Sequence, residues 1–205
     1  MYSSYNASGQ PSNPTQAQSG AIFQWFQSVD QDRSGKITAT ELRQALINGN
    51  YTHFSLEACK TLISLFNVDQ TQTIDFSEFQ HLFVFVNQWK EAFERFDRDK
   101  SCAIDDKELE QALTQMGYRL SPQTVQAMIK KYESPSKKNQ ITFDNFIVAC
   151  VQLQKLTSMT SYIILTNKKY LYPFPLDSFR SHDKELKGQI SIGYEDFIKA
   201  VLESL

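Results

Sequence analysis

Five isoleucines in similar sequence surroundings recur along the chain, and this repeat constrains the fold more than any other feature. They lie 37, 30, 37 and 49 residues apart, at Ile37, Ile74, Ile104, Ile141 and Ile190. Polar loops surround them, and the segments between them show the apolar periodicity of amphipathic helices. Long and short intervals alternate over the first four, as expected for helix–loop–helix units that pair two by two. The sequence therefore predicts an all-α fold with short pairings between loop strands.

The loop around the first isoleucine has oxygen-bearing residues at alternating positions and a glycine, Gly35, at its sixth position. Alternate residues of a tight loop direct their oxygens at one point, and calcium takes about seven oxygens. Glycine allows the positive φ with which the chain turns there. This is the twelve-residue EF-hand pattern, over residues 30–41. The predicted calcium ligands are Asp30, Asp32, Ser34, the carbonyl of Lys36, and Glu41.

The third loop, residues 97–108, has the same pattern with one more carboxylate at a ligand position. Cys102 replaces the glycine, and a non-glycine residue at positive φ costs about 1–2 kcal/mol. That cost corresponds to about a tenfold loss of affinity, which the additional carboxylate offsets. We therefore expect calcium binding here too. The predicted ligands are Asp97, Asp99, Ser101, the carbonyl of Ala103, and Glu108.

The second loop, residues 67–78, keeps oxygen-bearing side chains at five ligand positions. However, Asn67 is neutral at the first position and Gln72 replaces the glycine. Calcium affinity depends on the number of charged ligands. We interpret this loop as part of a structural, metal-free hand, with weak calcium binding as the alternative.

The fourth and fifth loops are predicted to fold as hands without tight calcium binding. The fourth, residues 133–145, contains a proline and two lysines, and Asn145 stands where the closing glutamate is expected. The fifth, residues 183–196, has Lys187 and Tyr194 at ligand positions. An ammonium group offers no lone pair to a cation.

An odd number of hands leaves the fifth without a partner in the chain. Exposure of its apolar surface would be unusual in a monomer. We therefore expect a dimer in which two fifth hands pair. The residues predicted to form this contact are Ile190, Ile192, Tyr194, Phe197 and Val201.

The last interval is 19 residues longer than the alternation predicts, and residues 158–176 account for the excess. This segment is rich in β-branched and aromatic residues, and Pro173 and Pro175 within it cannot continue a helix. It is either a surface loop with a contact site of its own or intron sequence that was not spliced out. We favour the second interpretation. In either case we expect it to loosen the fifth hand and to weaken dimerisation.

Composition narrows the function classes. Residues 1–20 are polar and are predicted to form a flexible tail before a single domain over 21–205. The net charge of −2 and the lack of a Lys/Arg cluster argue against a nucleic-acid partner. Three widely spaced cysteines favour a reduced, intracellular location. The three histidines fit no nucleophile–base pattern, so we do not expect an enzyme.

Five hands with this spacing and a short polar tail resemble the penta-EF-hand family, from Ala21 to Leu205 apart from the excess segment. Within the family, the chain most resembles one member over Trp25–Asp30, Leu113–Pro122, 133–145 and Asp177–Arg180. The resemblance implies a cytoplasmic calcium sensor and adaptor that acts in endoplasmic-reticulum-to-Golgi vesicle transport on those membranes. It also implies a homodimer, or a heterodimer with another penta-EF-hand protein, and calcium-dependent peptide or protein partners. The alternative is a passive calcium buffer, or a constitutive dimerisation subunit.

The sensor hypothesis needs apolar surface whose exposure changes with calcium. The helix predicted over residues 79–96 offers a row of aromatic side chains. They form either a ligand groove or part of the core. These residues are Phe83, Phe85, Trp89 and Phe93.

Overall fold

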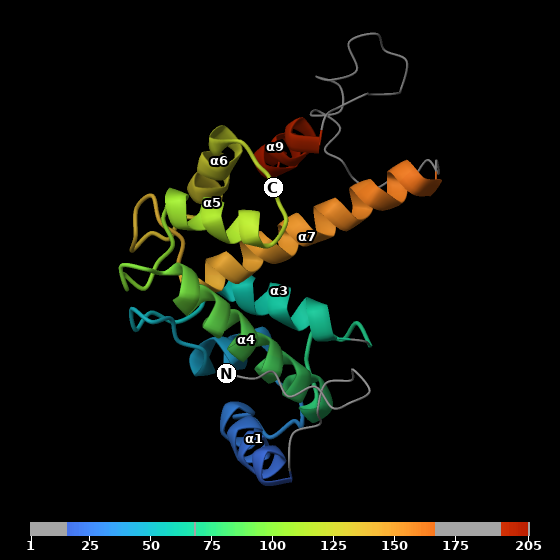
Figure 1. Cartoon of the computed structure of the whole chain (residues 1–205). Helices are drawn as coiled ribbons and strands as arrows, with labels where there is room; N and C mark the ends of the chain where they lie inside the picture. Colours follow the sequence, from blue (N-terminus) through green and yellow to red (C-terminus); the bar gives the residue numbers. More distant parts are fainter. Residues whose placement is uncertain (1–15, 68, 167–193, 205) are drawn as a thin grey trace. The chain divides into compact units, whose positions relative to one another are not determined.

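The computed structural model describes residues 16–67, 69–166 and 194–204. Its helices follow the predicted pattern of paired hands (Figure 1). They are α1 (Gln16–Val29), α2 (Ala39–Ala45), α3 (Leu56–Phe66), α4 (Phe76–Phe96), α5 (Asp106–Gln115), α6 (Pro122–Tyr132), α7 (Phe143–Thr166) and α9 (Tyr194–Ser204). In these ranges the extended pairings are isolated bridges between loops. The predicted all-α fold is confirmed.

Two helix ends differ from the predicted boundaries. Helix α1 begins at Gln16, inside the predicted tail, and residues 1–15 lie outside the described ranges. Helix α7 continues to Thr166, so the first nine residues of the segment 158–176 are helical. Neither glycine nor proline occurs between Phe143 and Pro173, and the sequence therefore does not interrupt the helix earlier. Residues 167–176 lie outside the described part.

The chain divides into two compact units, and the first comprises residues 1–47 and 53–88. Its two loops pair through Ile37 and Ile74, which exchange N–H···O bonds of 2.8 and 3.0 Å and are completely buried. Aromatic rings of α1 pack on the start of α4: Trp25 contacts Phe79 and Phe83 with ring centroids 5.1 and 5.2 Å apart. The two predicted hands of this unit therefore share one core.

The second unit comprises residues 48–52 and 89–205. Its loops pair in the same way through Ile104 and Ile141, with N–H···O bonds of 2.8 and 2.9 Å. The last part of α4 contributes Trp89 and Phe93, whose rings lie 5.8 and 5.6 Å from that of Phe146 on α7.

The aromatic row on α4 is therefore engaged within the chain. Phe83 contacts Trp25, and the Phe85 ring lies 5.3 Å from that of Phe66, both in the first unit. Trp89 and Phe93 pack on Phe146 in the second. Of these residues, Phe93 is buried and belongs to the core, whereas Phe83, Phe85 and Trp89 are half-buried despite their ring contacts.

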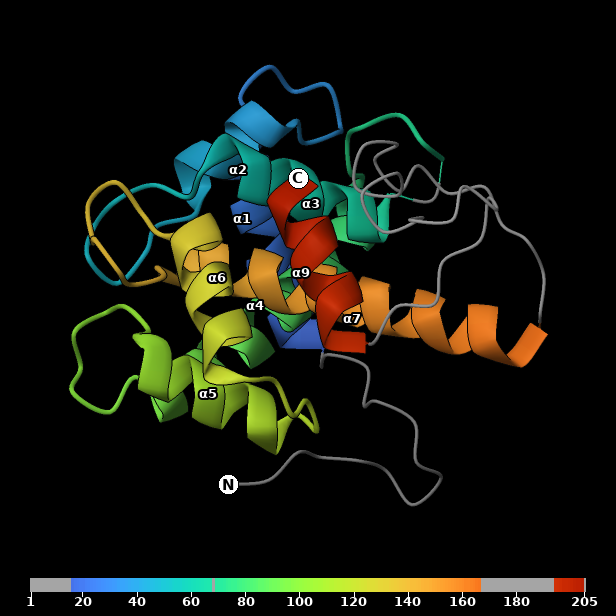
Figure 2. The same ribbon diagram turned by 90° about the horizontal axis from the view of Figure 1, so that it is seen from above.

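Helix α9 packs against α6 and α7 within the second unit. Figure 2 shows α6 and α9 side by side. Ile198, Val201 and Leu202 are buried in this contact region. The Glu195 carboxylate accepts a 2.5 Å hydrogen bond from the amide of Ser121, the N-cap of α6. The last helix of the chain is thus attached to the hand before it.

The short connection after α2 belongs to the second unit. The buried Asn48 accepts a hydrogen bond of 3.1 Å from the amide of Asp144 at the start of α7. Gly49 lies against Cys102 of the third loop, where an added Cβ would come within 3.1 Å of the sulfur. Any larger residue at position 49 would therefore press on that loop.

Within the described ranges, each helix is too short or too polar to span a bilayer.

Candidate metal centres

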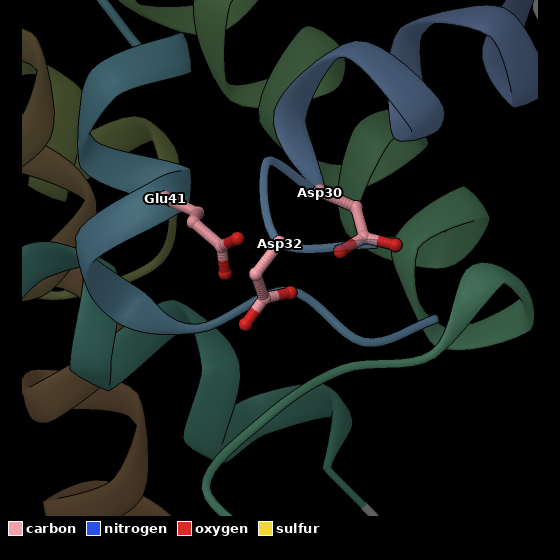
Figure 3. A group of neighbouring side chains, drawn as sticks. All are labelled: Asp30, Asp32 and Glu41. Carbon is pink, nitrogen blue, oxygen red and sulfur yellow. The ribbon is translucent and has the colours of Figure 1, made fainter. Parts of the chain in front are cut away.

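Three carboxylates gather around the first loop. Asp30 directly follows α1, Asp32 lies in the loop, and Glu41 is on α2 (Figure 3). Each offers a carboxylate oxygen, and these oxygens lie within 4.8 Å of one another. Asp30 and Glu41 are 7 % and 9 % exposed, whereas Asp32 is exposed. The loop therefore concentrates negative charge on one point that remains open to solvent.

Backbone amides hold the closing glutamate in place. Glu41 is the third residue of α2 and forms a capping box with Thr38, whose amide donates to Oε2 at 2.9 Å. Oε1 accepts a second bond, of 3.0 Å, from the amide of Gln31. Asp30 is held similarly, by the amides of Ser34 and Gly35 at 3.0 and 2.9 Å. The carboxylates are thus positioned by the fold of the loop itself.

The third loop repeats this arrangement. Oxygens of Asp97, Asp99 and Glu108 lie within 4.8 Å of one another. Glu108 accepts from the amides of Arg98 and Asp105 at 2.8 and 3.1 Å, and Asp105 caps α5 in a second capping box.

The sixth position of the third loop has the backbone geometry expected from the sequence. Cys102 adopts φ 61°, close to the 77° of Gly35 in the first loop. Its amide donates to Asp97 at 2.9 Å, as the amide of Gly35 does to Asp30. Cysteine thus reproduces the glycine turn, with the backbone strain of a non-glycine residue.

The electrostatics of both loops reflect these contacts. Hydrogen bonds from Ser34 and Ser101 hold the pKa values of Asp32 and Asp99 below their usual range, and the nearby Lys137 ammonium adds to the effect at Asp99. At Asp97, burial raises the pKa. The hydrogen bonds that this carboxylate accepts from the amides of Cys102 and Ser101 act in the opposite direction but are smaller in effect.

The donor set fits calcium. Carboxylate and carbonyl oxygens are the ligands that this hard cation prefers. The two predicted carbonyl ligands, Lys36 O and Ala103 O, accept hydrogen bonds of 2.9 and 3.0 Å from the hydroxyls of Ser34 and Ser101. The three predicted carboxylate ligands of each loop are therefore close together, and its serine and carbonyl ligands are in contact with each other.

The second loop has the backbone of its neighbours but not their charge. Gln72 adopts φ 61°, as Cys102 does. Within the described ranges, only the first and third loops bring three carboxylates together. Asp69 instead pairs with the Lys36 ammonium at 3.0 Å, and the Thr71 hydroxyl and this ammonium lower its pKa to about 2. The buried Asn67 Oδ1 has no hydrogen-bond partner among the described residues.

The fourth loop is closed by its own hydrogen bonds. The Asn145 side chain, at the closing position, donates to the carbonyl of Tyr132 at 2.9 Å. The amide of Lys137 donates to Ser134 O at 2.9 Å, and the two residues form an antiparallel bridge. The Lys137 ammonium donates to Ser101 O of the third loop at 3.1 Å. Here hydrogen bonds join the loop ends that an ion would otherwise join.

Most of the predicted fifth hand, residues 183–193, lies outside the described ranges, and so do Ile190 and Ile192. Tyr194 and Phe197 lie on α9, but their side chains are outside the described part. Val201 is 9 % exposed, on a helix that packs on α6 and α7. The dimer contact stays a prediction.

Sequence reasoning missed two kinds of contact. Thr38 and Asp105 position the closing glutamates, and the pattern of a capping residue three positions before a glutamate could have indicated them. Lys36 and Lys137 reach the paired loop with their ammonium groups. Neither contact has a local sequence signal, because it depends on how the loops pair.

The chain matches the family model of the EF-hand domain pair over residues 21–84 and 86–150. It is 37 % identical to sorcin of Mus musculus over 200 residues, which cover 96 % of this chain and 89 % of sorcin. Peflin of Danio rerio is 34 % identical over 201 residues, which cover 98 % of this chain and 67 % of peflin. This chain belongs to the penta-EF-hand family. Like the family, it binds calcium.

Other comparisons agree with this assignment. Human peflin is 39 % identical over 176 residues, which cover 86 % of this penta-EF-hand chain. These residues span 55 % of human peflin, so the chain covers little more than half of that relative. A solved homolog of programmed cell death 6 protein from Leishmania major Friedlin shares 26 % identity, with a TM-score of 0.59 and 90 % of each chain covered. The family member that the sequence most resembles is peflin, with the apoptosis-linked penta-EF-hand adaptor as the alternative, and the similarity to peflin is confirmed.

Proposed function

We propose that this protein is a calcium sensor and adaptor in which the first and third hands bind the ion. The observation that carries the proposal is the grouping of three carboxylates within 4.8 Å in these two loops. The proposed ligands in the first are Asp30, Asp32, Ser34, the Lys36 carbonyl and Glu41. Those in the third are Asp97, Asp99, Ser101, the Ala103 carbonyl and Glu108.

Calorimetric titration with calcium tests these ligands. The parent chain is compared with Glu41→Ala and Glu108→Ala, and Glu78→Ala in the second loop is the matched control. We expect two sites with dissociation constants of about 10⁻⁷–10⁻⁵ M, the range of calcium sensors. Each site should disappear in its own variant and both should persist in the control. Absence of binding below millimolar calcium would overturn the proposal.

One observation favours a second candidate, a calcium buffer that does not change shape. Glu41 and Glu108 already accept hydrogen bonds from amides on the opposite side of their loops. The closing glutamates are therefore already close to the other ligands, and calcium binding would require little movement of the exit helices α2 and α5. An apolar dye separates the candidates, because a sensor changes its fluorescence with calcium and a buffer leaves it constant.

Dimerisation is the second part of the proposal. The odd number of hands supports a contact between fifth hands, in a homodimer or in a heterodimer with another penta-EF-hand protein. The prediction is that deleting residues 158–176 tightens this dimer, because α7 then leads directly into the fifth hand. Sedimentation of both forms gives the dimer dissociation constants, and equal values would contradict the effect of the segment.

The cellular role proposed from the family resemblance is regulation of vesicle transport from the endoplasmic reticulum to the Golgi. The protein would act in the cytoplasm and on these membranes through calcium-dependent contacts with protein or peptide partners. Fractionation of cells with and without calcium chelation, followed by detection of the protein on vesicle membranes, tests this role. A protein that never enters the membrane fractions would contradict it.

A further inference from the structure

A lysine of the fourth loop reaches into the third. The Lys137 ammonium donates to the carbonyl of Ser101 at 3.1 Å. Ser101 is the fifth residue of the third loop, and its hydroxyl and amide contact the seventh-position carbonyl and the carboxylates of Asp97 and Asp99. The ammonium is therefore placed beside the group of oxygens that we assign to calcium.

The fourth loop fixes the position of this charge. The amide of Lys137 donates to Ser134 O at 2.9 Å, and its carbonyl accepts from the amide of Gln140 at 3.2 Å. The Ile104–Ile141 bridge holds the two loops together, and the side chain of Lys137 is half-buried. A lysine held at its backbone and at its ammonium group keeps its charge near the neighbouring loop.

We propose that Lys137 lowers the calcium affinity of the third loop, so that the fourth hand, which has no ligand set of its own, sets the affinity of its neighbour. This inference rests on the proposed binding of calcium by the third loop. Two cations close together repel each other. The contact with Ser101 also holds the third loop in place, and this by itself would raise the calcium affinity. Repulsion outweighs it because Asp97 and Glu108 are already held by amides of their own loop.

The size of the effect follows from Coulomb's law. A unit charge that acts on a divalent ion from about 7 Å through a water-like medium changes the dissociation constant by about three- to tenfold at low salt. Salt screens charges near the surface, with a Debye length of about 10 Å at 0.1 M. The effect should therefore shrink as ionic strength rises.

The first pair of loops has a comparable contact with a different outcome. There the Lys36 ammonium pairs with Asp69 at 3.0 Å, and the second loop that receives it does not gather three carboxylates. In the second pair the receiving loop does gather them. Of the two loop pairs in the described part of the chain, only the second therefore brings a lysine against a loop that gathers three carboxylates.

The experiment uses the full chain with Glu41→Ala, so that calorimetry reports on the third loop. Lys137→Gln is compared with Lys138→Gln, which makes the same charge change at the exposed neighbour, and with Lys137→Arg, which keeps the charge. We expect Lys137→Gln to bind calcium about three- to tenfold more tightly at low salt and less so at 0.5 M salt. Lys138→Gln and Lys137→Arg should stay within about twofold of the parent.

The outcomes separate this inference from the function on which it rests. Parental binding that Glu108→Ala abolishes but Lys137→Gln leaves unchanged or weakens would overturn the inference alone. Absence of binding in both the parent and Lys137→Gln would overturn calcium binding by the third loop as well. Binding that appears only in Lys137→Gln would support the inference. Circular dichroism and thermal unfolding of each variant show that the fold is intact.

Discussion

The sixth residue of the first three loops adopts a backbone conformation that L-residues rarely take. Gly35 has φ 77°, and Gln72 and Cys102 both have φ 61°. The sequence predicts this requirement at a fixed offset from the isoleucine, because the loop geometry is local. It also predicts that Cys102 takes this turn at a cost in strain, but not which amide contacts support it, since those contacts form only in the folded chain.

Replacing Cys102 with glycine should stabilise the protein. Glycine adopts positive φ without the side-chain clash, which costs other residues about 1–2 kcal/mol, although it loses more entropy on folding. We expect the free energy of unfolding to rise by about 0.5–1 kcal/mol, measured by urea denaturation in a chelator. Gly35→Ala should lower it in the same assay. A lower midpoint for Cys102→Gly would contradict this view of the loop.

Alkaline pH should destabilise the protein through two buried groups. Burial raises the pKa of the Cys150 thiol from 9.0 to about 12 and that of Tyr132 from 10.0 to about 12. The unfolded chain loses these protons first, so the stability present below pH 9 is lost as the pH rises towards 12. Each group lowers the free energy of unfolding by about 1.4 kcal/mol per pH unit in its window. Cys150→Ala should flatten this dependence between pH 9 and 10, where Cys150 titrates before Tyr132 in the unfolded chain, and an unchanged slope would refute its role.

At the scale of helices and loops, the chain uses two ways to close a hand. The first and third loops close around carboxylates held by capping boxes, whereas Asn145 closes the fourth with a direct bond to Tyr132 O. The capping boxes could have been predicted from the sequence, because their residues are three positions apart. The continuation of α7 through residues 158–166 was not predicted, although nothing in these residues breaks a helix.

The contact between α9 and α6 gives a test at this scale. Glu195→Ala removes the acceptor of the Ser121 amide and should lower the free energy of unfolding by about 1–2 kcal/mol. Hydrogen exchange should become faster in α9. Asp196→Ala is the control, because Asp196 is exposed on the same helix. Equal exchange in the two variants would show that Glu195 does not hold α9.

At the scale of the whole molecule, the alternating intervals correctly predict that loops pair two by two. Each pair is built around an isoleucine bridge in its own unit. The sequence does not predict that residues 48–52 join the second unit. That assignment depends on Asn48 and Gly49 meeting Asp144 and Cys102, which are distant in sequence.

Calcium should stabilise the whole chain against heat. A ligand that binds only the folded state adds about 2.7 kcal/mol at a hundred times its dissociation constant. At about 1 mM free calcium, two sites of about 10 µM would therefore raise the melting temperature clearly, as followed by circular dichroism. Glu41→Ala and Glu108→Ala should each remove part of the rise. A rise that persists in the double variant would place the ions elsewhere.

Because each bridge fixes an isoleucine, natural selection can alter the first half of a loop without moving the helix that follows. In the first four loops, the closing residue comes four positions after the isoleucine. These residues are Glu41, Glu78, Glu108 and Asn145. The fourth loop has the same distance although its first half contains a proline and two lysines. A hand can therefore lose its metal by mutation while its partner keeps the geometry that binding requires.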